Sequence, residues 1–270
     1  MVLGGLAWAH QPGGSVLKIS IVIPVYNDPR ISKALDSVVS QRFDGQVELI
    51  VMDGGSRDAT QDVVRGYVER VSVLVSEPDR GIFDALNKGI ERATGDVIGL
   101  LGADDRYEDP NVLRDVAAAL AAPDVDACFG DLVYVDDDDN VRRYWRTGRY
   151  ARWKLHLGWM PPHFTLFARR GVYERAGLFD ISLRVAADYE HMLRLFLGER
   201  IRTRYIPRVM LRMTLGGNSN RSLRNIATGN MQSFGAWRRF GAAQGLLVPV
   251  LKPAQKLLQY LHRPPGDTAG

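Results

Sequence analysis

Strand-like and helix-like segments alternate through the first half of this 270-residue chain, and no other sequence feature limits the fold as strongly. The run KISIVIPVYN is typical of a strand buried on both faces, and RISKALDSVVSQ after it places apolar residues on one helical face. The same pairing recurs in QVELIVMDGGS, VSVLVSEP and DVIGLLGADD, each followed by a helical pattern, and DVDACFGDLVYVD is a fifth strand. This spacing predicts an α/β fold with a Rossmann-like, mostly parallel central sheet flanked by helices.

Polar residues follow each of the first four predicted strands. Ligands of parallel sheets bind beyond the carboxyl ends of the strands, where these residues would meet at one edge. The first strand ends in Pro24, Tyr26, Asn27 and Asp28, the second in Asp53 to Ser56, the third in Glu77 to Arg80, and the fourth in Asp104 and Asp105. We expect a binding site there, with the ring of Tyr26 stacking on a base and Asp53 accepting from a base N–H or a ribose hydroxyl.

The adjacent carboxylates Asp104 and Asp105 have two interpretations. Mg²⁺ and Mn²⁺ are typically held by one or two carboxylates together with substrate phosphates, which predicts a metal that bridges a diphosphate. The alternative is an Asx turn with a helix cap before Pro110. The first strand is followed by neither GxxxxGK[ST] nor GxGxxG, so no glycine loop cradles a phosphate, and this favours the metal.

A further acid begins the segment VAADYEHMLRLFL (185–197). Its apolar positions Tyr189, Met192, Leu193, Phe196 and Leu197 follow the spacing of an amphipathic helix, which places Asp188 near the start. Asp188 is therefore either an N-cap or a general base that the helix dipole keeps ionised. Spacing alone does not decide between them.

Charge is distributed unevenly along the chain. Residues 1–199 hold 30 of the 31 acids, whereas residues 200–266 hold no Asp or Glu and 12 Arg or Lys. A second basic run, 142–154, contains six basic and four aromatic residues. We expect the later part to contact an anionic surface; the alternative is a solvated basic surface. The segment 245–262 either docks on an anionic leaflet or packs as a helix on the catalytic domain. No nucleic-acid-binding motif accompanies the basic residues, so no nucleic-acid partner is expected.

The quoted motifs together resemble the family 2 glycosyltransferases of GT-A fold, over roughly residues 18–220. IVIPVYND is similar to the opening strand and nucleotide-facing loop of that family, and VMDGGSRDAT to its second-strand motif, with Gly54 where the family more often has a second Asp. SEPDRGIFDALNKGIERATGDVIGLLGADD is similar to a bacterial polysaccharide- and glycolipid-building branch. LGGNSN (215–220) resembles the Gly-Gly-x-Ser loop of that branch.

The resemblance implies roles for individual residues. Asp188 corresponds to the catalytic base, although Ala187 stands where the family commonly has Glu. Asp105 corresponds to the direct metal ligand, and Asp104 faces the ribose or a water on the metal. The implied nucleotide-sugar contacts are Pro24, Tyr26, Asp28, Asp53, Asp79, Asp84, Asn87, Lys88 and Asp104.

The resemblance thus implies an inverting glycosyltransferase that uses Mn²⁺ or Mg²⁺ and a nucleotide-diphosphate sugar. The acceptor would be a saccharide, a glycolipid or a polyprenyl-diphosphate-linked saccharide. Two alternatives are a sugar-phosphate nucleotidylyltransferase, which normally opens with a Gly-rich loop, and a non-catalytic nucleotide-sugar-binding module.

Four segments are expected along the chain: a loose tail (1–17), a nucleotide-sugar-binding half (18–140), an acceptor-side half of the same domain (141–222) and a basic amphipathic extension (223–270). The single cysteine, Cys128, excludes an internal disulfide and fits a reducing compartment. The N-terminus lacks the basic start of a signal peptide. We expect a cytoplasmic protein that associates with the inner face of the cell membrane.

Overall fold

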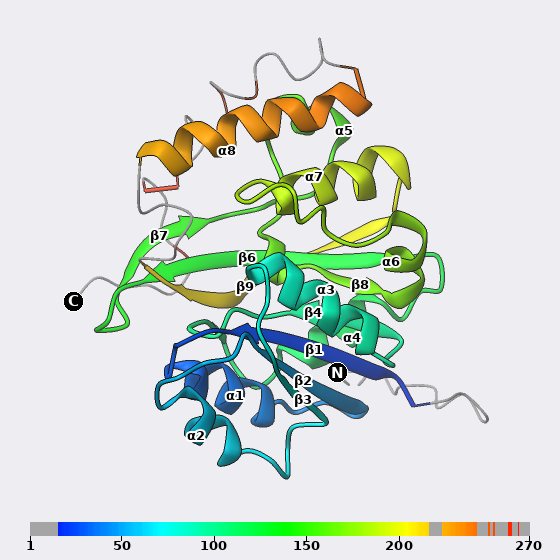
Figure 1. The fold of residues 1–270 in the computed structure, drawn as a ribbon. Coiled ribbons are helices and arrows are strands. Elements are labelled where there is room, and N and C mark those ends of the chain that lie inside the picture. The colour runs from blue at the N-terminus through cyan, green and yellow to red at the C-terminus, as the bar shows by residue number, and fades with distance from the viewer. Residues whose placement is uncertain are drawn as a thin grey trace, which may run out of the picture.

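Strand β1 (Lys18–Val25) lies between β2 (Gln46–Asp53) and β4 (Val97–Leu100), and β2 also pairs with β3 (Val73–Ser76). All four strands are parallel (Figure 1). The computed structural model describes residues 16–215 and 223–241, together with positions 248, 251, 259, 260 and 264. Val25 pairs with Asp53 and Asp53 with Ser76, so the strands end at one edge, as the sequence predicts.

The second half extends the same sheet with strands of both directions. β8 (Phe167–Arg169) is antiparallel to β4 and to β6 (Ala127–Val135), and β9 (Thr203–Thr214) is parallel to β6. β7 (Val141–Trp145) and β5 (Arg106–Tyr107) pair antiparallel with β6 and β9. The two expected halves meet at residue 140, between β6 and β7, and these two strands pair with each other. Within the described residues, both halves therefore belong to one sheet of nine strands.

Helices cover both faces of the sheet (Figure 1). One hydrophobic core lies under α1 (Ile31–Val39), α2 (Thr60–Arg65) and α4 (Val112–Ala119). The other lies under α3 (Ile82–Arg92), α6 (Arg170–Ala176) and α7 (Ala187–Leu193), with the short α5 (Arg152–Leu155) at its border. Burial on both faces explains why the first strands are continuously apolar.

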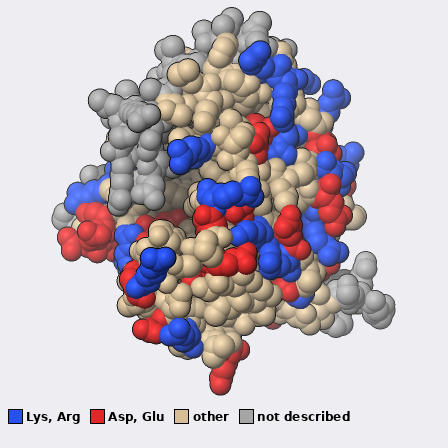
Figure 2. All heavy atoms as spheres, viewed as in Figure 1, with Lys and Arg blue, Asp and Glu red and all other residues tan. Residues whose placement is uncertain are grey.

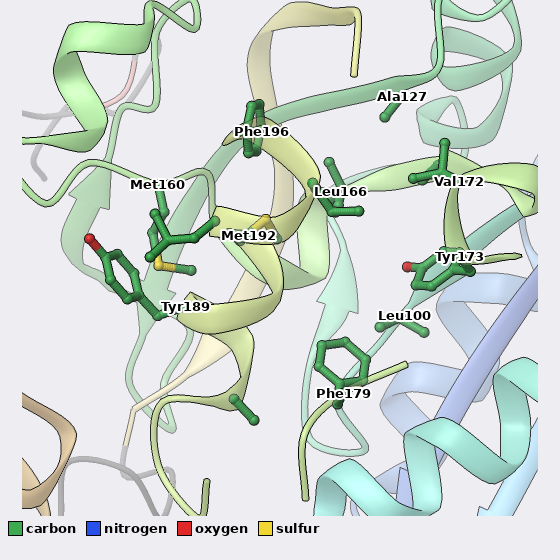
Figure 3. Packing of buried hydrophobic residues seen from close by; sticks show 14 of the residues in the cluster. Leu100, Ala127, Met160, Leu166, Val172, Tyr173, Phe179, Tyr189, Met192 and Phe196 are labelled. Carbon is green, nitrogen blue, oxygen red and sulfur yellow. The ribbon is translucent and has the colours of Figure 1, made fainter. Parts of the chain in front are cut away.

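Helix α7 confirms the amphipathic pattern predicted for 185–197. It continues as one π-helical turn over Arg194–Gly198, and all five predicted apolar positions are buried. Tyr189, Met192 and Phe196 point into a cluster that includes Met160 and Leu166 (Figure 3). This packing fixes the position of Asp188 relative to the sheet.

Helix α8 (Leu223–Ala236) packs against α7, at the top of Figure 1. The Gln232 side-chain oxygen accepts the backbone N–H groups of Val185 and Ala186, and the Trp237 indole donates to the Tyr189 hydroxyl at 3.0 Å. The start of the expected extension is therefore part of the folded core. Most of the segment 245–262, and the LGGNSN loop beyond Leu215, lie outside the described residues. In the part of the chain that the structure describes, no helix is long and apolar enough to cross a membrane.

Candidate active site

The loops after β1 and β2 are tied together beside the exposed ring of Tyr26. The Asn27 N–H donates to Ser56 Oγ at 2.8 Å, and the Arg57 N–H donates to Asn27 Oδ1 at 2.9 Å. Asn27 has a left-handed backbone (φ 48°), which asparagine tolerates better than most residues. Tyr26 is 62% exposed at this rim, whereas Pro24 is buried inside β1. Tyr26 is thus free to meet a ligand, and Pro24 shapes the strand beneath it.

Asp53 is buried at the end of β2, and its carboxylate is already hydrogen-bonded. Oδ1 accepts the Ser56 N–H at 2.9 Å, and Oδ2 accepts the Ser76 hydroxyl at 2.6 Å and the Gln61 amide at 3.2 Å. A small pocket beside it is lined by Asp53 with Met52, Glu77, Asp79, Ala85 and Lys88. Three of the predicted nucleotide contacts, Asp53, Asp79 and Lys88, therefore lie together.

Gly54 has a specific packing reason to lack a side chain. A Cβ atom at this position would lie 2.4 Å from Oδ2 of Asp79 and 3.3 Å from the Tyr26 ring. Asp79 is fixed there because its Oδ1 accepts the Gly81 N–H at 2.7 Å. The carboxylate of Asp79 thus fills the space beside Gly54, where the family more often carries a second Asp.

The three predicted contacts on α3 are bound to other protein groups. Asp84 is buried and pairs with Arg80 at 2.6 Å, which lowers its pKa. Lys88 pairs with Glu77 at 2.8 Å. The Asn87 amide exchanges two 2.9 Å hydrogen bonds with the backbone of Phe179 and so joins α3 to the second half. Asp84 and Asn87 hold the helix in place, whereas Lys88 also lines the pocket.

At the opposite side of the rim, Arg30 bridges two predicted site acids. Its guanidinium lies 2.6 Å from Asp28 Oδ2 and 3.1 Å from Asp104 Oδ2. The hydrogen bonds with Arg30 lower the pKa of Asp28. Burial raises the pKa of Asp104, and the positive charge of Arg30 opposes this rise. Arg30 was not predicted as a site residue; its position two residues after Asp28 was the available signal.

Asp105 is 3% exposed and is held by the end of β9. Its Oδ1 accepts the Thr214 N–H at 3.1 Å, while the Thr214 hydroxyl donates to the Asp104 carbonyl at 2.6 Å. Oδ2 accepts no hydrogen bond from a described residue and lies 2.4 Å from the place that a Cβ of Gly102 would take. Burial and the negative charge of Asp104 raise the pKa of Asp105 well above its ordinary value. A buried carboxylate with one open oxygen fits a hard cation.

Tyr134 on β6 connects the two acids of greatest interest. Burial raises the pKa of its phenol to about 12; the positive charge of Arg143 opposes this rise, and the carboxylates of Asp105 and Asp188 add to it. Arg143 of β7 stacks on the Tyr134 ring, with 3.6 Å between the guanidinium carbon and the ring centroid. Tyr134 therefore lies near both acids, and neither it nor Arg143 was predicted as a site residue.

Asp188 lies inside the first turn of α7, so the N-cap interpretation is wrong: the cap residue is Ala186, without a side-chain hydrogen bond. The Asp188 carboxylate accepts the Tyr189 N–H at 2.7 Å and is partly exposed. It is therefore reachable by a substrate. Figure 2 shows a hollow on this face of the molecule, with acidic atoms at its lower edge and basic side chains beside it.

Comparison with known sequences identifies the family of this chain. The profile of Glycosyl transferase family 2 matches residues 20–176. A PGL/p-HBAD biosynthesis glycosyltransferase of Mycobacterium tuberculosis is 32% identical over 206 residues, which cover 74% of this chain and 78% of the relative. An uncharacterized glycosyltransferase of the same species is 30% identical over 179 residues, with 65% and 68% covered.

Solved structures show the same fold. TarS 1–349 of S. aureus, in complex with UDP-GlcNAc, superposes with a TM-score of 0.66 at 19% identity, covering 89% of this chain and 69% of TarS. The mannosyltransferase PcManGT of Pyrobaculum calidifontis, in complex with GDP-Man and Mn²⁺, gives 0.63 at 22% identity, covering 94% and 78%. These likenesses confirm the predicted mixed α/β architecture.

Proposed function

The chain belongs to glycosyl transferase family 2 and is a glycosyltransferase, and from that premise we propose an inverting, metal-dependent transfer from a nucleotide-diphosphate sugar to an acceptor hydroxyl. One observation carries the proposal. Asp105 after β4 and Asp188 on α7 both act on the phenol of Tyr134, so the two acids lie near the same buried side chain although 83 positions of sequence separate them. An in-line displacement needs stabilisation of the leaving group and a base for the acceptor, and we assign these roles to Asp105 and Asp188.

The nucleotide is proposed to bind at the ends of β1, β2 and β3, within the half 18–140. The exposed ring of Tyr26 offers a stacking face, and the pocket beside Asp53, Asp79 and Lys88 offers acceptors and a cation. UDP-GlcNAc and GDP-Man, which are bound in the TarS and PcManGT structures, are the donor chemistries to test first. Asp28 borders this site through its ion pair with Arg30.

The residues present fit a divalent cation at Asp105, with Asp104 beside it. Oδ2 of Asp105 is open, and a cation would relieve the repulsion that raises the pKa of this buried acid. Within the described residues no group of three or more His, Cys, Asp or Glu could hold a metal, so substrate phosphates would complete the shell. When bound, Mn²⁺ or Mg²⁺ supplies positive charge that stabilises the diphosphate leaving group.

Asp188 is proposed to remove the proton of the acceptor hydroxyl as the oxygen attacks the anomeric carbon. The Tyr189 N–H holds one carboxylate oxygen, which orients the group. The bond from oxygen to the anomeric carbon forms as the bond to the diphosphate breaks, so configuration inverts in one step. In this proposal the segment 141–222 forms the acceptor side.

A thermal-shift screen tests the donor half of the proposal. Purified protein is mixed with UDP- and GDP-sugars, with Mn²⁺, with Mg²⁺ and with EDTA. A true donor raises the melting temperature in proportion to RT ln(1 + [L]/Kd), and the rise should require the metal. A protein that no nucleotide sugar stabilises under any of these conditions would contradict the proposal.

The acceptor is proposed to be a saccharide on a glycolipid or a polyprenyl diphosphate, met at the inner face of the cell membrane. Trp153 of α5 is 61% exposed and Met231 of α8 is 76% exposed, and a tilted ring contact between His156 and Trp237 joins the C-terminal ends of the two helices. Exposed Arg152 and Arg239 accompany them. Apolar side chains among basic ones are typical of surfaces that contact anionic lipid.

Flotation with vesicles of phosphatidylglycerol and phosphatidylcholine tests this surface. The protein should float with anionic vesicles at low salt and less at high salt, because the charges are screened. A W153A/M231A variant should float less, whereas L74A, which removes an exposed leucine from β3, should not change. Absence of binding at low salt would refute the membrane contact.

A further inference from the structure

Arg143 is a buried cation that has no anionic partner among the residues the structure describes. The residue is 6% exposed, and its Nε finds no hydrogen-bond partner. Across the described residues, the guanidinium makes no hydrogen bond or ion pair with any side chain. Its neighbour Arg142 points elsewhere, donates to Asp136 at 2.6 Å and is mostly exposed. The two adjacent arginines of β7 thus have opposite environments.

The Arg143 guanidinium is held between two aromatic rings. Its carbon is 3.6 Å from the centroid of Tyr134 and 5.8 Å from that of Tyr260. Stacking occupies the face of the guanidinium, whereas its N–H donors lie along the edge, the direction in which arginine binds planar and tetrahedral anions. Burying a charge without a partner is costly, so such groups usually meet a counter-ion in the functional state.

The strand pairing connects Arg143 to the metal side of the site. Tyr134 is paired with Arg143 on one side and Met213 on the other, and the next residue of β9 is Thr214. Thr214 in turn holds Asp105. Consecutive strands therefore lead from Arg143 through Tyr134 to Asp105, the proposed metal ligand.

We propose that Arg143 binds a phosphate oxygen of the donor's diphosphate, and that the Tyr134 ring is the platform that orients it. The inference rests on the proposed function and adds a second cation to it. An arginine fork matches phosphate oxygens with two parallel hydrogen bonds, which a lysine does not reproduce. The bound arginine would remain on the diphosphate as charge develops on the leaving group, so it would assist departure as well as binding.

Binding of nucleotides without turnover tests the inference. The affinities of UDP, UMP, GDP and GMP are measured by calorimetry in the presence of Mn²⁺ for wild type, R143M, R143K and R142M. R143M should lower the affinity for whichever diphosphate wild type binds by about ten- to hundred-fold, as expected when charge-assisted hydrogen bonds are lost. Its affinity for the matching monophosphate should stay within about two-fold.

The other variants separate binding from structure. R143K should recover part of the lost diphosphate affinity because it keeps the charge, and R142M should bind like wild type. Unchanged diphosphate affinity in a folded R143M protein, or equal loss for diphosphate and monophosphate, would overturn the inference. A wild-type protein that binds neither UDP nor GDP would overturn the proposed function first, and the inference with it.

Discussion

The guanidinium of Arg30 lies 3.1 Å from Oδ2 of Asp104 and 2.6 Å from Oδ2 of Asp28, so an arginine neutralises this part of the donor rim in the free protein. Asp105, beside them, has no ion-pair partner among the described residues and carries a raised pKa. The two neighbouring aspartates therefore differ in their electrostatic environment. Asp104 already has a cation, whereas the open oxygen of Asp105 is the one that a metal can use.

Removal of Arg30 should strengthen metal binding to the free protein. In R30Q, Asp104 loses its positive neighbour, so Mn²⁺ affinity measured by EPR without nucleotide should rise by about two- to five-fold, as expected for a partly exposed ion pair. R57Q is the control, since Arg57 lies on the adjacent loop and makes no ion pair with a described acid. Weaker Mn²⁺ binding in R30Q would show that Arg30 supports the metal site instead.

Asp105→Asn should stabilise the metal-free protein and abolish its response to metal. A carboxyl whose pKa is raised by folding contributes stability that is present below its unfolded pKa of about 3.9 and lost as pH rises through the folded pKa. At neutral pH, above that unfolded pKa, Asp105 therefore costs stability, and the asparagine, which can still accept the Thr214 N–H, removes that cost. Calorimetry with Mn²⁺ and with EDTA measures both effects. A lower melting temperature for D105N would contradict the argument.

When the pH is lowered, Mn²⁺ affinity should begin to fall at a higher pH than it would for carboxylates of ordinary pKa. Protonation removes the charge that binds the cation, and burial raises the pKa of both Asp105 and Asp104. Mn²⁺ affinity should therefore decline at pH values above about 3.9, the usual value for Asp. A titration followed by EPR, within the range where circular dichroism shows a folded protein, measures the midpoint. Constant affinity down to that value would show that neither acid is a ligand.

Asp188→Asn should separate chemistry from donor binding. Loss of a positioned base typically costs ~10²–10⁴-fold in kcat. Affinity for the nucleotide-diphosphate sugar should remain within about two-fold because Asp188 is proposed to act on the acceptor hydroxyl and not on the donor. Steady-state rates measure the loss of kcat, and calorimetry measures the donor affinity. D180N is the control, since Asp180 lies in the loop before α7 and accepts a hydrogen bond from Ser182. Transfer by D188N at the wild-type rate would exclude this residue as the base.

Gly54→Asp, which introduces the acid more common in the family, should impair this protein. The new side chain would collide with Oδ2 of Asp79. The Asp79 carboxylate would then move, and its Oδ1 would lose the hydrogen bond from the Gly81 N–H. Nucleotide affinity should fall by about ten-fold, which is the effect expected from the loss of one or two hydrogen bonds. The double variant G54D/D79G should recover much of it, since one acid would again occupy the space. A G54D protein that binds like wild type would show that Asp79 is free to move away.

Much of the architecture was predictable from local pattern. The continuous apolar strands, their helical crossovers and the amphipathic pattern around Tyr189 and Met192 follow from periodicities that the side chains carry themselves. The convergence of Tyr26, Asp53 and Asp104 on one rim then follows because parallel strands end together. The N-cap interpretation of Asp188 is wrong by two residues, since the cap is Ala186, and helix boundaries are the least certain part of such a pattern.

The sequence by itself thus determined the α/β layer and the edge at which the polar strand ends meet. Only the tertiary structure decided how the acids are paired: Thr214 holds Asp105 from 109 positions away, Asp79 fills the space beside Gly54, and Arg143 stacks on Tyr134 with no anion among the described residues. The physical reason is the separation along the sequence between the residues that set each property. Periodicity records which face of an element is buried, whereas the ionisation and coordination of a carboxylate depend on side chains that distant strands bring within a few ångströms.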